Sequence, residues 1–129
     1  MVTSEEREPR RPLSPHLQIY RLPLTAKLSI THRLTGVALG GGLLLVLWWF
    51  TALAISPRYF ALVDGILSST FGGLVLLAAV WAFWFHFLNG LRHLVWDTGR
   101  GIENRAAERS AWAVIALSLL LTLVTALVA

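Results

Sequence analysis

Residues 34–57 read LTGVALGGGLLLVLWWFTALAISP, and none of these 24 positions carries a charge. A helix needs about 20 mostly apolar residues to cross about 30 Å of hydrocarbon at about 1.5 Å per residue. Two further stretches meet this requirement, because residues 65–91 and 110–129 also lack Asp, Glu, Lys and Arg, over 27 and 20 positions. Helices of a soluble bundle would alternate apolar and charged faces. The sequence therefore predicts an all-α integral membrane protein with three transmembrane helices.

The expected domains are an N-terminal arm, residues 1–24, and a three-helix anchor, residues 25–129. The arm is polar and Pro-rich, holds three Glu residues and lacks the apolar core of a signal peptide. We therefore expect an extended arm on the cytoplasmic or matrix side of the membrane. Ser56 and Pro57 should end the first helix, and residues 58–64 are expected to form a turn. The expected membrane spans are about 30–55, 67–93 and 108–128.

The charges are few and unevenly placed. Only 14% of the 129 residues are charged, against roughly a quarter in soluble domains, and the formal net charge is +4. Six Lys and Arg residues precede position 34, one lies in the 58–64 connection, four lie in 92–109 and none follows. Since Lys and Arg favour the inner side of a membrane, we expect the N-terminus inside and the C-terminus outside. This placement accounts for the positive charge, so no nucleic-acid partner is expected.

The sequence contains no cysteine. This excludes a disulfide framework, a cysteine-ligated iron–sulfur cluster, a thioether-linked haem and a thiol nucleophile in this chain. Any iron–sulfur part of an electron path must therefore belong to a partner subunit.

Polar side chains inside a membrane are costly, so each one is a functional candidate. Ser29, His32 and Arg33 stand at i, i+3 and i+4, which places them on one face at the inner end of the first helix. A residue that only anchors the helix at the interface does not need an aligned hydroxyl beside it. We therefore favour a binding function for Ser29 and Arg33 over simple anchoring.

A second polar cluster ends the second expected helix, where His86, Gly90, His93 and Asp97 form one stripe. His86 is the deepest of them, roughly 10 Å farther into the membrane than His93 at about 1.5 Å per residue. A neutral imidazole at this depth must find a hydrogen-bond partner or bind a metal. Both a structural histidine and a haem ligand stay open on this observation.

Two details favour haem. Gly90, one turn from His86, leaves room for a flat macrocycle or another helix. Haem used for electron transfer is held from both faces by side chains, so the second axial ligand would come from another subunit. The residues expected at the inner membrane edge, where haem propionates would point, are His32, Arg33, Arg92 and His93.

Three segments resemble one family. Residues 11–20 (RPLSPHLQIY), 29–36 (SITHRLTG) and 86–97 (HFLNGLRHLVWD) resemble, in order, motifs of the cytochrome b subunits of succinate dehydrogenase, respiratory complex II. The resemblance implies half of a heterodimeric anchor bundle, with one b-type haem shared with a second three-helix anchor subunit. It also implies an iron–sulfur subunit and a flavoprotein subunit on the inner side, with the dicarboxylate chemistry on those partners and ubiquinone as electron acceptor.

The resemblance also implies roles for individual residues. His86 would be an axial ligand of the haem iron. The other cofactor-binding residues would be His32, Arg33 and His93. The ubiquinone-binding residues would be Ser29, Ile30, Arg33 and Asp97. Independently of the resemblance, Asp97 is considered as a partner of Arg33 that would tune proton delivery to the quinone.

The expected location is a bacterial cytoplasmic membrane rather than the mitochondrial inner membrane. An anchor of a fumarate reductase, working in the opposite direction, and a haem-free structural anchor stay open as alternatives. A small transporter or channel subunit would need ionisable residues through the whole membrane thickness. The first and third expected helices carry none in their centres.

Overall fold

The computed structural model describes residues 21–129, so the expected arm lies outside the described residues except for its last four positions. Four helices follow in order: α1 (Leu24–Ile55), α2 (Pro57–Leu67), α3 (Thr70–Asp97) and α4 (Asn104–Val128). No strand occurs in the described part, and α1, α3 and α4 are each long and apolar enough to cross a membrane. This confirms the all-α membrane fold. The limits of the membrane along each helix stay a prediction.

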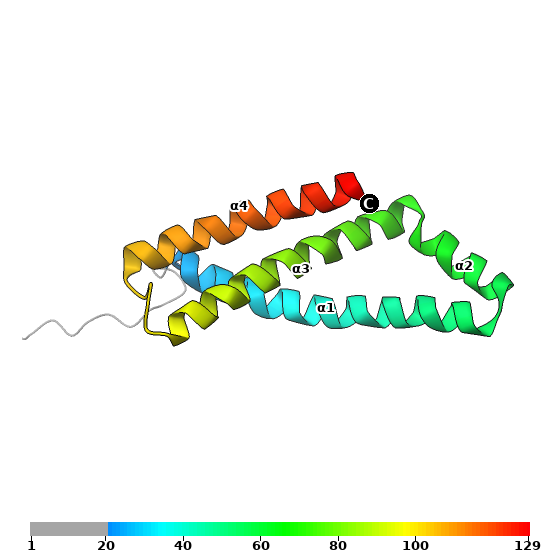
Figure 1. The fold of residues 1–129 in the computed structure, drawn as a ribbon, viewed down its shortest axis with the longest axis horizontal. Helices are drawn as coiled ribbons and strands as arrows, with labels where there is room; N and C mark the ends of the chain where they lie inside the picture. The colour runs from blue at the N-terminus through cyan, green and yellow to red at the C-terminus, as the bar shows by residue number, and fades with distance from the viewer. Residues whose placement is uncertain (1–20) are drawn as a thin grey trace, which may run out of the picture.

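The long helix α3 lies between α1 and α4 and packs against both (Figure 1). Its C-terminal end lies beside the N-terminal ends of the other two, so the three helices run up, down and up. A buried cluster of Leu28, Phe85, Ala111 and Val114 joins all three helices near this end. Farther along, the indole of Trp84 donates a hydrogen bond to the hydroxyl of Thr125 at 3.0 Å and joins α3 to α4.

The prediction of a turn at residues 58–64 is wrong, because the helix α2 occupies this connection. Ser56 has an extended backbone that ends α1, and its hydroxyl then accepts a hydrogen bond from the backbone N–H of Tyr59 at 3.2 Å. Serine caps the free N–H groups of a first helical turn, and Pro57 suits the first position because it has no N–H to satisfy. The same two residues that end α1 therefore start α2.

Two tryptophans hold α2 against the end of α1. The indole N–H of Trp48 donates to the hydroxyl of Tyr59 at 2.8 Å, and that of Trp49 donates to a carboxylate oxygen of Asp64 at 3.0 Å. Both bonds join neighbouring helices across the corner. The two indole N–H groups thus each have a hydrogen-bond partner on the neighbouring helix.

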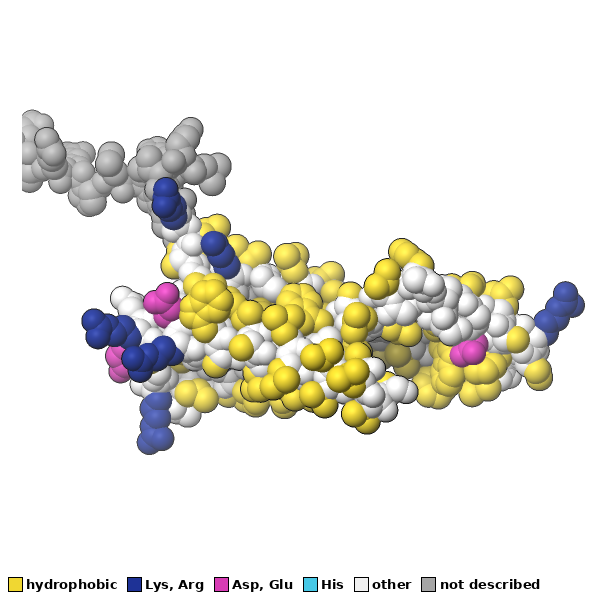
Figure 2. Space-filling view, turned by 90° about the horizontal axis from the view of Figure 1, so that it is seen from above, with side chains coloured by type: hydrophobic (Ala, Val, Ile, Leu, Met, Phe, Trp, Pro, Cys, Tyr) yellow, Lys and Arg dark blue, Asp and Glu magenta, His cyan; other side chains and the backbone are white. Residues whose placement is uncertain are grey.

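Apolar side chains cover the middle of the molecule, and the Lys and Arg side chains lie toward its ends (Figure 2). Many large apolar residues are more than half exposed, among them Leu34, Val37, Phe71 and Leu127. Such a surface needs lipid or the apolar surface of another subunit around it.

Candidate functional site

The structure brings three histidines together near the end of the bundle where α3 ends and α1 and α4 begin. The ring of His32 on α1 stacks on the ring of His86 on α3, with 3.9 Å between centroids and 12° between planes. His93, two turns after His86, follows at 5.3 Å from His32. His32 and His86 belong to two different polar clusters of the sequence, and the packing of α1 against α3 makes them neighbours.

The hydrogen bonds of His86 fix which of its ring nitrogens carries a proton. Nδ1 lies 3.0 Å from the backbone carbonyl oxygen of His32 and 3.3 Å from the hydroxyl oxygen of Thr35. A carbonyl oxygen can only accept, so Nδ1 must be the donor. In a neutral imidazole the other nitrogen, Nε2, then keeps its lone pair. Nε2 has no hydrogen-bond partner among residues 21–129.

Two glycines shape the space around this imidazole. A Cβ atom on Gly36 would lie 3.1 Å from Cε1 of His86, so the ring packs directly against the backbone of α1. A Cβ atom on Gly90, one turn along α3, would meet no atom within 4 Å. The ring is therefore tightly held on the α1 side, while the helix surface beside Gly90 is open.

His93 belongs to a second hydrogen-bond group. Its Nε2 lies 3.4 Å from the side-chain nitrogen of Asn89, which is fully buried. The side-chain oxygen of Asn89 accepts a hydrogen bond from Arg92 at 3.3 Å. Asn89 thus connects the histidine cluster to a buried guanidinium.

Arg92 is 6% exposed and points toward α4. Its Nε donates to the hydroxyl of Ser110 and one terminal nitrogen donates to the carbonyl of Ala107, both at 2.9 Å. The guanidinium also lies 3.9 Å from the ring centroid of Trp96. The sequence predicts Arg92 at the inner membrane edge, beside haem propionates. In the structure its N–H groups instead donate hydrogen bonds to acceptors on α3 and α4. An arginine near a helix end resembles a surface anchor in a sequence, and only the packing of α4 shows the difference.

Most of the expected quinone-binding residues lie on the surface of the described part of the chain. Ser29 is half-buried, whereas Ile30 is 46% exposed and Arg33 is exposed. Asp97 is the last residue of α3 and is also exposed. No ion pair joins Asp97 to Arg33 in the described part of the chain. Ile30, Arg33 and Asp97 are therefore accessible from outside the described part of the chain.

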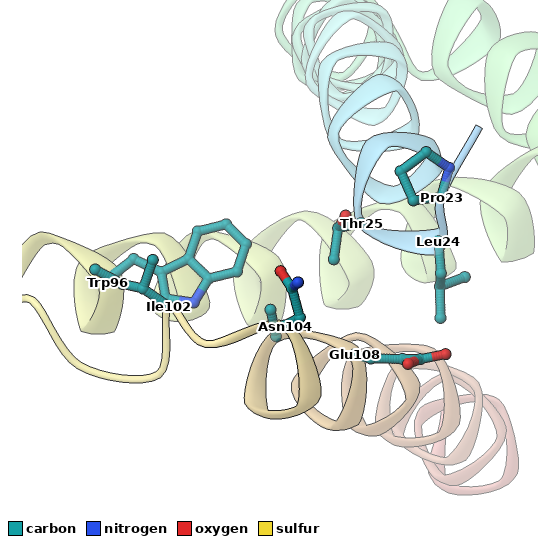
Figure 3. Close-up of a pocket in the computed structure, with 8 residues that line it drawn as sticks. Pro23, Leu24, Thr25, Trp96, Ile102, Asn104 and Glu108 are labelled. Carbon is teal, nitrogen blue, oxygen red and sulfur yellow. The ribbon is translucent and has the colours of Figure 1, made fainter. Parts of the chain in front are cut away.

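A cavity of about 540 Å³ opens at the same end of the bundle (Figure 3). It lies between the start of α1, the end of α3 and the start of α4, and its lining includes Thr25, Trp96 and Glu108. Thr25 stands one helical turn before Ser29, but Ser29, Ile30 and Arg33 do not line it. The cavity therefore adjoins the face of α1 that carries Ser29, but the expected quinone-binding residues do not line it.

Two buried polar atoms lack a hydrogen-bond partner among the described residues, Nδ1 of His32 and Nε1 of Trp81. Buried polar atoms are nearly always paired, so an orphan beside the His86 ring suggests that a neighbouring group is missing. The three histidines are not arranged to bind one metal ion together, and no other group of three His, Cys, Asp or Glu side chains within residues 21–129 could hold one. An iron bound at His86 would thus need further ligands from outside the described residues.

The fold and this cluster define a class, an all-α membrane subunit with three candidate spans and paired histidines between two of them. The family model of the succinate dehydrogenase/fumarate reductase transmembrane subunit matches residues 7–125. The chain belongs to this family.

Similar proteins agree with this membership. The chain is 48% identical over 118 residues to the succinate dehydrogenase cytochrome b556 subunit of Paracoccus denitrificans, covering 92% of this chain and 91% of that protein. It is 36% identical over 121 residues to the cytochrome b556 subunit of Rickettsia felis, covering 94% of each. The mitochondrial cytochrome b560 subunit of Mus musculus is 37% identical over 114 residues, or 85% of this chain and 66% of that protein. The resemblance found in the sequence is thus confirmed at the level of the family.

Proposed function

We propose that this chain is the membrane anchor of a succinate:ubiquinone oxidoreductase and that Nε2 of His86 is an axial ligand of a b-type haem. The observation that carries the haem proposal is the bond from Nδ1 of His86 to the carbonyl of His32. Histidine ligands commonly donate their second ring N–H to a carbonyl, which fixes the tautomer and leaves the other nitrogen for the metal. Bound haem would accept and release one electron at a time.

The surroundings of His86 also suit a large planar group. The open surface beside Gly90 offers space on α3, and the orphaned Nδ1 of His32 offers a polar contact. We assign His32, Arg33 and His93 to the propionate side, because carboxylates are stabilised by donors and cations. Nε2 of His93 already faces Asn89, so only its Nδ1 is free for this contact.

The second axial ligand would come from another three-helix anchor subunit. The exposed apolar faces of this chain support such a partner together with lipid. Iron–sulfur and flavoprotein subunits would carry the clusters and the dicarboxylate chemistry, since this chain has no cysteine. They would dock on the inner side of a bacterial cytoplasmic membrane, against the end rich in Lys and Arg.

We further propose that Ser29, Ile30 and Arg33 form one wall of the ubiquinone site, with Asp97 at its edge. A quinone that is reduced gains negative charge on its carbonyl oxygens, and preorganised donors stabilise that charge. The Ser29 hydroxyl would donate to one carbonyl, and the Arg33 guanidinium would supply a permanent positive charge beside it. Ile30 would present an apolar surface to the ring.

The haem ligand is tested by replacing the two histidines of α3 separately in the assembled complex. His86→Ala should abolish the b-type absorption in a reduced-minus-oxidised spectrum, whereas His93→Ala should keep it. Equal haem loss in the two variants would refute the assignment of His86. If the wild-type complex shows no b-type absorption despite full haem supply, the haem proposal is refuted and the alternative of a haem-free structural anchor remains.

The quinone wall is tested by Arg33→Ala, with the exposed Arg100→Ala as the matched control. Loss of one transition-state donor or charge costs about 100- to 1,000-fold in rate, so ubiquinone reduction should fall by about that factor. Succinate oxidation by a soluble artificial acceptor should stay unchanged in both variants. If both activities fall together in Arg33→Ala, the residue serves assembly and not quinone binding.

A further inference from the structure

The imidazole of His86 is restrained by one short segment of α1, residues 32–36. The His32 carbonyl and the Thr35 hydroxyl meet its Nδ1, and the Gly36 backbone meets its Cε1 edge. The His32 ring covers one of its faces at 3.9 Å. The side chain is therefore held on an edge and on a face by a helix other than its own.

The hydroxyl of Thr35 has its own proton committed elsewhere. Thr35 is 4% exposed, and its Oγ1 lies 2.9 Å from the carbonyl oxygens of both Thr31 and His32. Because both are acceptors, Oγ1 donates to them and can only accept from the Nδ1–H of His86. The hydroxyl thus adds a second acceptor on the side where the imidazole carries its proton.

Gly36 restrains the ring by shape. A Cβ at this position would lie 3.1 Å from Cε1, 3.6 Å from Nδ1 and 4.0 Å from Nε2 of His86. Contacts this short force the neighbour to shift by a few tenths of an ångström. A shift of the imidazole away from α1 would stretch its Nδ1 bonds and disturb the His32 stack. Any side chain at position 36 would therefore tilt the ring.

We propose that Thr35 and Gly36 are positioning residues that set the tautomer and the ring plane of His86 for haem binding. The inference rests on the proposed function of His86 as an axial ligand. Neither residue would touch the iron. Loss of the partners that orient a metal-binding histidine typically costs about 10- to 100-fold in metal affinity.

Two variants remove these contacts one at a time, and two matched controls come from the same helix. Thr35→Val removes the hydroxyl but keeps the branched shape, and Gly36→Ala adds the obstructing methyl group. Thr31→Val removes a hydroxyl that bonds only the carbonyl of Lys27 one turn earlier. Gly40→Ala adds a methyl group in open space. Thr35→Ser restores the hydroxyl and serves as the rescue.

The measurements use the purified complex with all its subunits. Haem transfer to an excess of apomyoglobin reports haem release, and electron paramagnetic resonance of the ferric haem reports the ligand plane. We expect Thr35→Val and Gly36→Ala to release haem about 10- to 100-fold faster and to shift the largest g value. Thr35→Ser and the two controls should match the wild type. Should Thr35→Val fail to assemble, Thr35→Ala is measured in its place.

The outcomes separate this inference from the proposed function. Haem that is present in the wild type and lost in His86→Ala, but unchanged in Thr35→Val and Gly36→Ala, overturns only the positioning role. Haem release that rises equally in the controls also overturns it, because a general loss of helix stability would explain that result. A wild-type complex without haem, or haem retained in His86→Ala, overturns the proposed function itself.

Discussion

At the scale of the residue, Arg92 shows how a permanent charge is accommodated between membrane helices. Charged groups at this position are costly unless paired or hydrogen-bonded. Arg92 donates to Ser110, Asn89 and the carbonyl of Ala107, and its cationic plane lies over Trp96. Its planar fork satisfies partners on two helices at once, which the single ammonium group of a lysine cannot reproduce.

Arg92→Met should therefore destabilise the assembled anchor. The carbonyl of Ala107 keeps a hydrogen bond from the Ser110 hydroxyl at 3.0 Å, but the buried side-chain oxygen of Asn89 loses its donor. A buried acceptor left unpaired costs about 1–3 kcal/mol. Thermal unfolding of the detergent-solubilised complex should show a lower midpoint, with Arg92→Lys intermediate. The exposed Arg100→Met is the control, and an equal midpoint in all three variants would show that the network adds no stability.

His86 could be singled out from sequence, because a lone imidazole deep in an apolar helix needs a partner. Its contact with His32 could not be predicted from helical spacing. The contact between His32 and His86 depends on how α1 and α3 are rotated and shifted against each other, and residue spacing within one helix carries no information on that register. Arg92 was placed at the membrane edge for the same reason, since its partners Ser110 and Ala107 lie on α4.

At the scale of the element, the short helix α2 joins the end of α1 to the start of α3 (Figure 1). Three long helices could be predicted because an uncharged run of 20 or more residues has few other uses. The sequence predicts a turn where α2 lies, because a connection with two charged residues carries no hydropathy signal for a helix. The sequence signal for α2 lies in its N-cap, because Ser56 followed by Pro57 favours the start of a new helix.

Ser56→Ala should loosen α2 without affecting α3. Loss of an N-cap serine costs about 0.5–2 kcal/mol, so amide exchange in residues 57–67 should speed up by about 5-fold for a cost of about 1 kcal/mol. Hydrogen–deuterium exchange read by mass spectrometry measures this directly. Ser56→Asn keeps a capping acceptor and should exchange like the wild type. Unchanged exchange in Ser56→Ala would mean that the tryptophan contacts alone hold α2.

Gly72 and Gly73 give a second test of this corner, because they are adjacent and differ only in their neighbours. A Cβ on Gly72 would overlap the backbone carbonyl groups of Ile66 and Leu67, whereas a Cβ on Gly73 would meet nothing within 4 Å. Gly72→Ala should lower the thermal midpoint of the complex, since overpacking against a fixed backbone costs about 1–3 kcal/mol. Gly73→Ala should be neutral or stabilising by about 0.5–1 kcal/mol. Equal effects of the two changes would contradict the close approach of α2 to α3.

At the scale of the whole molecule, the chain has little core of its own. In a membrane, helices do not gain from hiding apolar surface from water, so close packing and hydrogen bonds must hold them together. The described interfaces show both devices, with His86 against Gly36 between α1 and α3, and Arg92 and Trp84 between α3 and α4. Stacking and hydrogen bonding between side chains of different helices therefore hold the fold together and also form the candidate site.

The charges predict the orientation of the whole chain in the membrane. This prediction can be tested without removing any native thiol from the chain, because the chain has no cysteine. Single cysteines replace exposed residues: Ala61 on α2, Glu103 before α4, and Ala129 at the C-terminus. Lys and Arg gather at the end that includes Glu103, and such ends stay in the cytoplasm. A membrane-impermeant maleimide added to intact spheroplasts should therefore label Ala61→Cys and Ala129→Cys, and should label Glu103→Cys only after lysis. The reverse pattern would overturn the orientation, and labelling of Ala61→Cys and Ala129→Cys from opposite sides would overturn the three-span topology itself.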